Sequence, residues 1–414
     1  MRKNIFIAFL LIIILSLGLR LGFTENKNKS NDQLYKLVEL FSDTLAVIQK
    51  EYVDETKIKD LIYGSLKGML SSLDPHSQFM DPDTYNELKV DTQGKFGGIG
   101  IEITLKNGIL TVITPIEDTP AWKAGIKAND SIVKINDELT RDMTLTDAVK
   151  RLRGKPLDPV NITVLRENEN KLLEFKIVRD IIKIKDIKYA MILESGVGYI
   201  RLTEFRENST QELNNALSNL SKQGVKALII DLRNNPGGLL DEAVKVTSRF
   251  LERNKLVAYT EGRQKDKELK FYADSRNPIL DMPLAVLINE GSASGSEIVA
   301  GALQDYKRAI IIGTKSFGKG SVQTVIPLSD GSALRLTTSH YFTPSGKIIH
   351  GKGVVPDIEV ILKERDEKEN ESEEKKSIPK PEKESFDYKE DEQVVRALNV
   401  LEAIIFYKQS DKIR

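Results

Sequence analysis

The sequence has no cysteine, which excludes disulfide bonds, thiolate metal sites and a cysteine nucleophile. Histidine is nearly as scarce: only His76, His340 and His350 occur, and none lies in the H-E-x-x-H arrangement typical of zinc hydrolases. An excess of charge is also lacking, because 61 basic residues balance 61 acidic ones. Such a chain has no overall field that attracts nucleic acid. We therefore expect no metal, no cofactor and no nucleic-acid partner.

The N-terminus carries an apolar segment with a basic start. Arg2 and Lys3 precede an apolar run over 5–19, which is longer than most signal-peptide cores and shorter than a full membrane span. No A-x-A-like cleavage site follows, and the side chain of Arg20 can reach the membrane interface while the span continues to residue 23. We expect residues 1–23 to be an uncleaved signal anchor, with a cleaved signal peptide as the alternative. Either way, the rest of the chain is expected outside the cytoplasm, in the cell envelope or periplasm.

Beyond this segment, the 414 residues are enough for about two to three domains. Helical periodicity over 34–52 and 58–70, ended by Pro75, predicts a helical region at 33–93. Short alternating segments separated by turns predict a small β domain at 94–181.

The second half of the chain has a different pattern. Apolar strands alternate with amphipathic helices over 182–362, which predicts a mainly parallel sheet with crossover helices. A Lys/Glu-rich stretch over 363–387 is typical of a disordered linker, and one last helix is expected within 388–414. The expected fold class is therefore α+β and multidomain, with an α/β core.

The β domain opens with a glycine-rich loop that runs into a strand. A turn with the sequence Pro-Ala-Trp-Lys-Ala-Gly-Ile at 120–126 follows, and a later helix begins at Thr144. This order of elements resembles a PDZ domain, in which backbone N–H groups of the loop bind the C-terminal carboxylate of a peptide that adds as a strand. The alternative is that these glycines only form a tight turn. The residues assigned to peptide binding are Gly97, Gly98, Ile99, Gly100 and Ile101.

A serine-rich turn lies between an apolar strand and a helix in the α/β region. It reads Ser-Ala-Ser-Gly-Ser over 292–296, so Ser294 is expected at a helix N-terminus, where free N–H groups favour a developing negative charge. Serines at such a turn more often serve as helix caps. A second motif, Phe-Gly-Lys-Gly-Ser-Val-Gln over 317–323, makes a catalytic interpretation more favourable.

The second motif also overlaps a near match to a phosphate-binding P-loop. Residues 313–319 read G-x-x-x-x-G-K, but the next residue is Gly320 instead of the Ser or Thr that holds magnesium. A P-loop also opens a helix, whereas 322–327 is predicted to form a strand. The sequence therefore disfavours nucleotide binding.

Together the two motifs resemble those of the C-terminal processing proteases, a family of serine peptidases also called tail-specific proteases or family S41. The resemblance extends from about Leu34 to Glu359. It implies a ClpP/crotonase-like protease core, Ser294 as the nucleophile, Lys319 as the general base and Gln323 as a residue that orients the lysine. The sequence departs from the family at Gly295, where alanine is usual.

The chemistry is consistent with this assignment. A serine hydroxyl needs a positioned base, and a lysine amine can act as one when burial lowers its pKa below about 10.4. The oxyanion of the acyl-transfer step needs backbone donors. The candidates are the N–H groups of Gly295 and of Gly237 or Gly238, between which the sequence does not choose.

The expected function is therefore that of a serine endopeptidase that cleaves exported proteins near a free C-terminus, with the PDZ-like domain binding that terminus or gating the site. The expected partners are polypeptide substrates and the membrane, and the chain is a candidate homo-oligomer. A Ser-His-Asp triad that uses His340 stays open, because triads are defined by geometry and not by sequence order. A catalytically silent PDZ scaffold of the cell envelope is the alternative function.

Overall fold

The computed structural model describes residues 32–106, 108–166, 169, 171–263, 268–361 and 386–411. The expected signal segment at 1–23 lies outside these ranges, and so does the expected charged linker up to residue 385. Within the described ranges, no helix combines the length and the apolar character needed to span a bilayer. The contacts within the chain define two compact units: residues up to Asp81 with Ile326–Leu336, and Pro82–Val325 with Thr337–Arg414.

The smaller unit is mainly helical. It contains a helix over 32–51, α2 (Ile58–Ser71) and β1 (Gln78–Met80), and β1 pairs antiparallel with 333–335. The turn before β1 is held by Asp74, whose carboxylate accepts hydrogen bonds from the backbone N–H groups of His76 and Ser77. The two helices agree with the helical periodicity of the sequence.

The PDZ-like part of the larger unit follows α3 (Pro82–Gln93), and its β2 (Lys95–Gly98) pairs antiparallel with β9 (Asp180–Lys183). Its other elements are β3 (Ile101–Lys106), β4 (Ile109–Pro115), α4 (Pro120–Ala124), β5 (Ser131–Ile135), β6 (Glu138–Leu139), α5 (Leu145–Leu152), β7 (Pro159–Leu165) and β8 (Leu173–Val178). The antiparallel sheet has the order β3-β4-β5-β7-β8, with β6 beside β5, so β3 is an edge strand. Thr144, where the sequence predicts that a helix begins, caps α5 through a reciprocal hydrogen-bond pair with Asp147.

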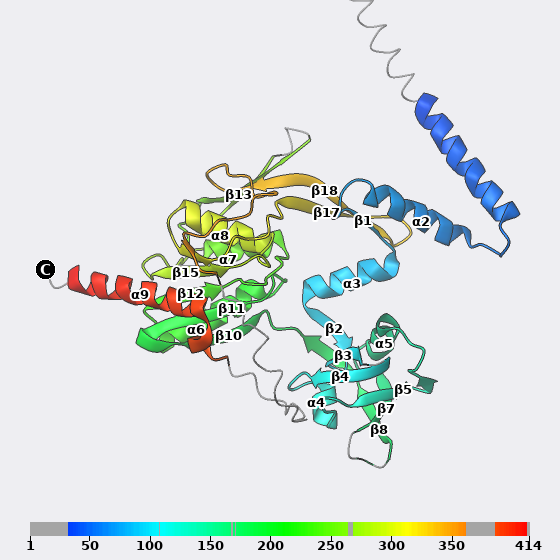
Figure 1. Ribbon diagram of the computed structural model, residues 1–414, viewed down its shortest axis with the longest axis horizontal. Helices are drawn as coiled ribbons and strands as arrows, with labels where there is room; N and C mark the ends of the chain where they lie inside the picture. The colour runs from blue at the N-terminus through cyan, green and yellow to red at the C-terminus, as the bar shows by residue number, and fades with distance from the viewer. Residues whose placement is uncertain are drawn as a thin grey trace, which may run out of the picture. The chain divides into compact units, whose positions relative to one another are not determined.

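The protease part contains the predicted, mainly parallel sheet, in the order β10-β11-β12-β15-β16-β19. In this sheet of the described residues, β10 pairs antiparallel with β11, and the other neighbouring strands pair parallel. Helices connect successive parallel strands from β11 to β16 along the chain (Figure 1). The elements of this sheet and its helices are β10 (Ile187–Ile192), η1 (Glu194–Gly196), β11 (Val197–Leu202), α6 (Ser209–Lys222), β12 (Ala227–Asp231), α7 (Leu240–Ser248), β15 (Leu284–Ile288), α8 (Gly295–Asp305), β16 (Ile310–Gly313), β19 (Ile358–Glu359), η4 (Tyr388–Glu390) and α9 (Glu392–Asp411). A second set of strands, β13 (Leu256–Gly262), β14 (Leu269–Tyr272), β17 (Ser321–Pro327) and β18 (Ala333–Phe342), pairs antiparallel around β13 and β18.

Both faces of the parallel sheet are covered. Apolar residues of α6, α7 and α8 pack on one face against side chains such as Ile230 and Val286. On the other face, α9 packs against Ile229 and Leu287, and Figure 1 shows α9 across β12 and β15 from α7 and α8. Alternate residues of one strand point to opposite faces, which explains why these strands are apolar throughout.

Candidate active site

Ser294 lies where β15 has ended and α8 begins. Its backbone has φ +53° and ψ −110°, a positive-φ conformation that is costly for a serine and is typical of functional turns. The side chain is only 7% exposed, and its hydroxyl lies 3.1 Å from the hydroxyl of Tyr341. Burial raises the pKa of Tyr341, so the phenol stays protonated. No motif in the sequence points to Tyr341, which is 47 residues from Ser294 in the chain.

The carboxylate of Glu297 connects the two sequence motifs. One oxygen, Oε2, accepts the backbone N–H groups of Ser294 and Lys319, each at 2.9 Å. The other, Oε1, accepts the N–H of Gly318 at 2.7 Å and the hydroxyl of Ser316 at 2.5 Å. Burial raises the pKa of Glu297, while these four donors oppose the rise by stabilising the ionised form. Its place three residues after Ser294 is the spacing of a capping box, a pattern that the sequence itself contains.

Lys319 lies in the loop between β16 and β17, and the flanking glycines allow a close backbone approach there. A Cβ on Gly320 would lie 2.3 Å from the backbone nitrogen of His350. Gln323, on β17, donates from Nε2 to the hydroxyl of Thr337 at 2.8 Å, and its buried Oε1 has no hydrogen-bond partner in the described part of the chain. The structure therefore brings the loops of Ser294 and Lys319 together through Glu297 and leaves an acceptor available on Gln323.

The two candidate oxyanion glycines differ in their surroundings. A Cβ on Gly237 would lie 2.7 Å from the Cβ of Ser294, so Gly237 packs directly against the serine, but its own N–H already donates to Asn235. A Cβ on Gly238 would instead meet the carbonyl oxygen of Phe205 at 2.2 Å. The N–H of Gly295, in the first turn of α8, makes no hydrogen bond to any described residue.

Two alternative site assignments lose support. His340 neighbours Tyr341 on β18, so its side chain points to the opposite face of the strand, where its ring lies 4.6 Å from that of His350. The segment 313–319 is followed by strand β17 and not by the helix that a P-loop requires. Among the described residues, no group of three or more metal-ligating side chains could hold a metal ion.

The five residues assigned to peptide binding have mixed environments. Gly97 and Gly98 belong to β2, and Gly97 packs so closely on Gly154 that a Cβ would lie 2.0 Å from its carbonyl oxygen. Ile99 is buried, and the carbonyl groups of Ile99 and Gly100 accept hydrogen bonds within the domain. Ile101 begins β3, an edge strand of the sheet with which an added peptide strand could pair.

The chain is similar to known proteases along most of its length. Family models described as "Peptidase family S41", "PDZ domain" and "Activating protease CtpB N-terminal domain" match residues 196–360, 97–177 and 20–84. The carboxy-terminal-processing protease of Bartonella bacilliformis is 44% identical, covering 87% of this chain and 82% of that protein. A probable CtpA-like serine protease of Staphylococcus epidermidis is 37% identical, covering 80% and 67%. Among solved structures, a photosystem II D1 C-terminal processing protease is 31% identical, with a TM-score of 0.45 over 78% of this chain and 92% of that chain.

Proposed function

Since the chain belongs to the carboxy-terminal-processing proteases of peptidase family S41, we propose that it is a serine endopeptidase with Ser294 as nucleophile and Lys319 as general base. The observation that carries this proposal is the single carboxylate of Glu297, which accepts the backbone N–H groups of both residues. It holds the two loops in one arrangement, as a positioned pair of nucleophile and base requires.

In the first step, the neutral amine of Lys319 takes the proton of the Ser294 hydroxyl while Oγ attacks the substrate carbonyl carbon. The free N–H of Gly295 stabilises the oxyanion, together with a donor from the turn at 236–238. The tetrahedral intermediate then collapses: the C–N bond breaks, and Lys319 returns the proton to the leaving amine. In the second step, Lys319 takes a proton from water, and the water oxygen attacks the acyl carbon. The bond to Oγ then breaks, the acid product leaves, and the proton returns to Ser294. Tyr341 orients the serine hydroxyl at 3.1 Å, and the Oε1 of Gln323, which is unpaired among the described residues, is available to accept a hydrogen bond from the lysine.

The proposed substrates are exported polypeptides with a free C-terminus. The edge strand β3 of the PDZ domain offers main-chain groups with which an extended peptide can pair, and we assign the binding of its terminal carboxylate to the adjoining residues 97–101. Substrate binding there either delivers the chain to Ser294 or gates the site.

The test is cleavage of an unstructured reporter with a free apolar tail. We expect the wild type to cleave it, an amidated reporter to be cleaved more slowly, and Ser294→Ala and Lys319→Ala to be inactive while folded by circular dichroism. Undiminished cleavage by Lys319→Ala would refute the assignment of the base. A silent PDZ scaffold would cleave nothing, and its Ser294 would not react with a serine-directed phosphonate.

We also propose that residues 1–23 anchor the protein in the cell envelope, with the protease on the extracytoplasmic side. The basic start and the apolar run over 5–19 support this topology. The full chain should remain in the membrane fraction after alkaline carbonate extraction, whereas a chain that lacks 1–23 should not. Release of the full chain by carbonate would refute the anchor.

A further inference from the structure

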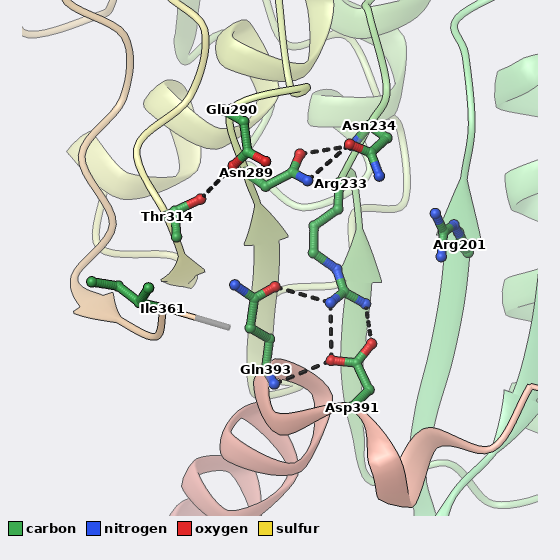
Figure 2. A pocket seen from close by; sticks show the side chains of 9 residues that line it. All are labelled: Arg201, Arg233, Asn234, Asn289, Glu290, Thr314, Ile361, Asp391 and Gln393. Carbon is green, nitrogen blue, oxygen red and sulfur yellow. Dashed lines mark hydrogen bonds and ion pairs between the residues drawn. The ribbon is translucent and has the colours of Figure 1, made fainter. Parts of the chain in front are cut away.

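A cavity of about 390 Å³ lies at the carboxyl ends of the parallel strands, on the face of the sheet that α9 covers (Figure 2). Its lining includes Arg201 from β11, Arg233 after β12, Asn289 after β15 and Asp391 before α9. Open α/β sheets hold their ligands at the carboxyl ends of their strands. Ser294 begins α8, which packs on the opposite face, so the cavity is separate from the proposed catalytic centre.

Of the two arginines beside this cavity, Arg233 binds two carboxylates, whereas Arg201 binds neither closely. The carboxylate of buried Asp231 accepts three hydrogen bonds from Arg233, two at Oδ1 and one at Oδ2, and a fourth from the hydroxyl of Tyr199. Both oxygens of Asp391 also accept hydrogen bonds from Arg233, at 2.9 and 2.7 Å. Arg233 thus has two carboxylate partners, and both carboxylates are directed to it.

Arg201, in contrast to Arg233, has no close carboxylate partner within the described ranges. Its Nη1 is 4.0 Å from Oδ2 of Asp231, too far for a hydrogen bond, and its buried Nε has no hydrogen-bond partner in the described part of the chain. Figure 2 shows its guanidinium apart from the bonded cluster around Arg233. The guanidinium of Arg201 therefore makes no hydrogen bond to a described residue, and an acceptor placed in the cavity beside its Nη atoms would be bound favourably.

We propose that this cavity binds a carboxylate group, that of a small organic acid or of a peptide end, through the guanidinium of Arg201. A guanidinium matches a carboxylate with two parallel hydrogen bonds. Glu290 and Asp391 also line the cavity, and their negative charge disfavours a doubly charged phosphate more than a singly charged carboxylate. The volume lies in the range of small-molecule sites, about 300–1,000 Å³.

The test uses the full chain with Ser294→Ala, which cannot turn over peptides, and acetyl-alanyl-alanine as the probe in calorimetric titrations. We expect the free acid to bind this cavity and its amide not to bind. Arg201→Gln should weaken this binding at least tenfold, and Arg201→Lys should recover only part of it, because an ammonium group cannot form the two parallel hydrogen bonds. Any peptide bound by the PDZ domain would be unaffected by these substitutions, so the difference between the variants isolates the cavity.

A second variant keeps the test decisive if Arg201→Gln does not fold. Ile361, which is 68% exposed, lines the cavity without touching the buried ion cluster, and Ile361→Trp should block entry of the probe. Isotherms that are the same in the Ser294→Ala chain and in its Arg201→Gln and Ile361→Trp variants would overturn the proposal. Inorganic phosphate that binds as tightly as the free acid, and depends equally on Arg201, would overturn the assignment to a carboxylate. The affinity for acetyl-alanyl-alanine is then compared with that for acetate. Equal affinities indicate that the cavity takes a small organic acid, and tighter binding of the dipeptide indicates a peptide end.

Discussion

Replacing Glu297 by glutamine tests whether one carboxylate aligns the whole site. The carboxylate accepts four hydrogen bonds, two at each oxygen. A glutamine amide keeps only one acceptor oxygen, and in either orientation its NH₂ group faces two donors. Two bonds are therefore lost, and at about 1.5–3 kcal/mol for each bond to a charged group the cost is about 3–6 kcal/mol. That is a large part of a typical stability of about 5–15 kcal/mol.

The loss should appear in catalysis as well as in stability. The unpaired donors belong to the loops of Ser294 and Lys319, and a displacement of about 1 Å in such a site costs on the order of 10²-fold in rate. We expect kcat of Glu297→Gln to fall by about that factor with a smaller change in KM, and phosphonate labelling of Ser294 to slow in parallel. The assays are reporter cleavage and urea unfolding.

Glu242 provides a matched control in the same domain. It is also buried, on α7, and accepts hydrogen bonds from the N–H and hydroxyl of Thr210 and from Lys245. Glu242→Gln should lower the unfolding midpoint while leaving kcat of the remaining folded protein near that of the wild type. A folded Glu297→Gln protein with kcat within twofold of wild type would refute the reasoning.

Three further predictions follow from single contacts. Tyr341→Phe should lower kcat about fivefold, the value of one hydrogen bond of about 1 kcal/mol, and an unchanged kcat would remove Tyr341 from the mechanism. Gly237→Ala should abolish phosphonate labelling of Ser294, because the new Cβ would lie 2.7 Å from the Cβ of that serine. The control Gly224→Ala, at φ +78° with open space around it, should cost only about 1–2 kcal/mol of stability. Burial opposes ionisation of Asp391, but Arg233 holds the pKa of that carboxyl below its usual value, so its contribution to stability is present above about pH 3.9 and lost at lower pH; Asp391→Asn should flatten this part of the acid unfolding profile, measured by circular dichroism.

Local patterns in the sequence were sufficient to predict most of the architecture. The alternation of apolar strands and helices predicted the parallel sheet, and the glycine loop with the 120–126 turn predicted the PDZ-like order of elements. The helix within 388–414 was also expected, but its place on the second face of the sheet was not. An amphipathic pattern shows that one face of a helix is buried, but it does not identify the element that covers this face.

The candidate site was only partly predictable for the same reason. Ser294 and Lys319 lie in short motifs that carry their own signal. Tyr341 and Arg201 carry none, since their roles arise only when distant strands meet, and Glu297 resembles an ordinary capping residue in the sequence. Gly237 packs against Ser294 and Gly238 against the carbonyl group of Phe205, a difference that arises from the tertiary fold and that no residue pattern records.

The shared acceptor at Glu297 also limits how such an enzyme can change over generations or by design. If the serine turn alone is exchanged for that of a relative, the N–H groups of the unchanged lysine loop no longer align with the carboxylate of the new turn. Exchange of the lysine loop alone would fail in the same way. A change in the backbone path of one loop is therefore tolerated only when the path of the other loop changes with it. Chimeras of these proteases should retain turnover when residues 292–297 and 316–319 are inherited together, and lose it when they come from different parents.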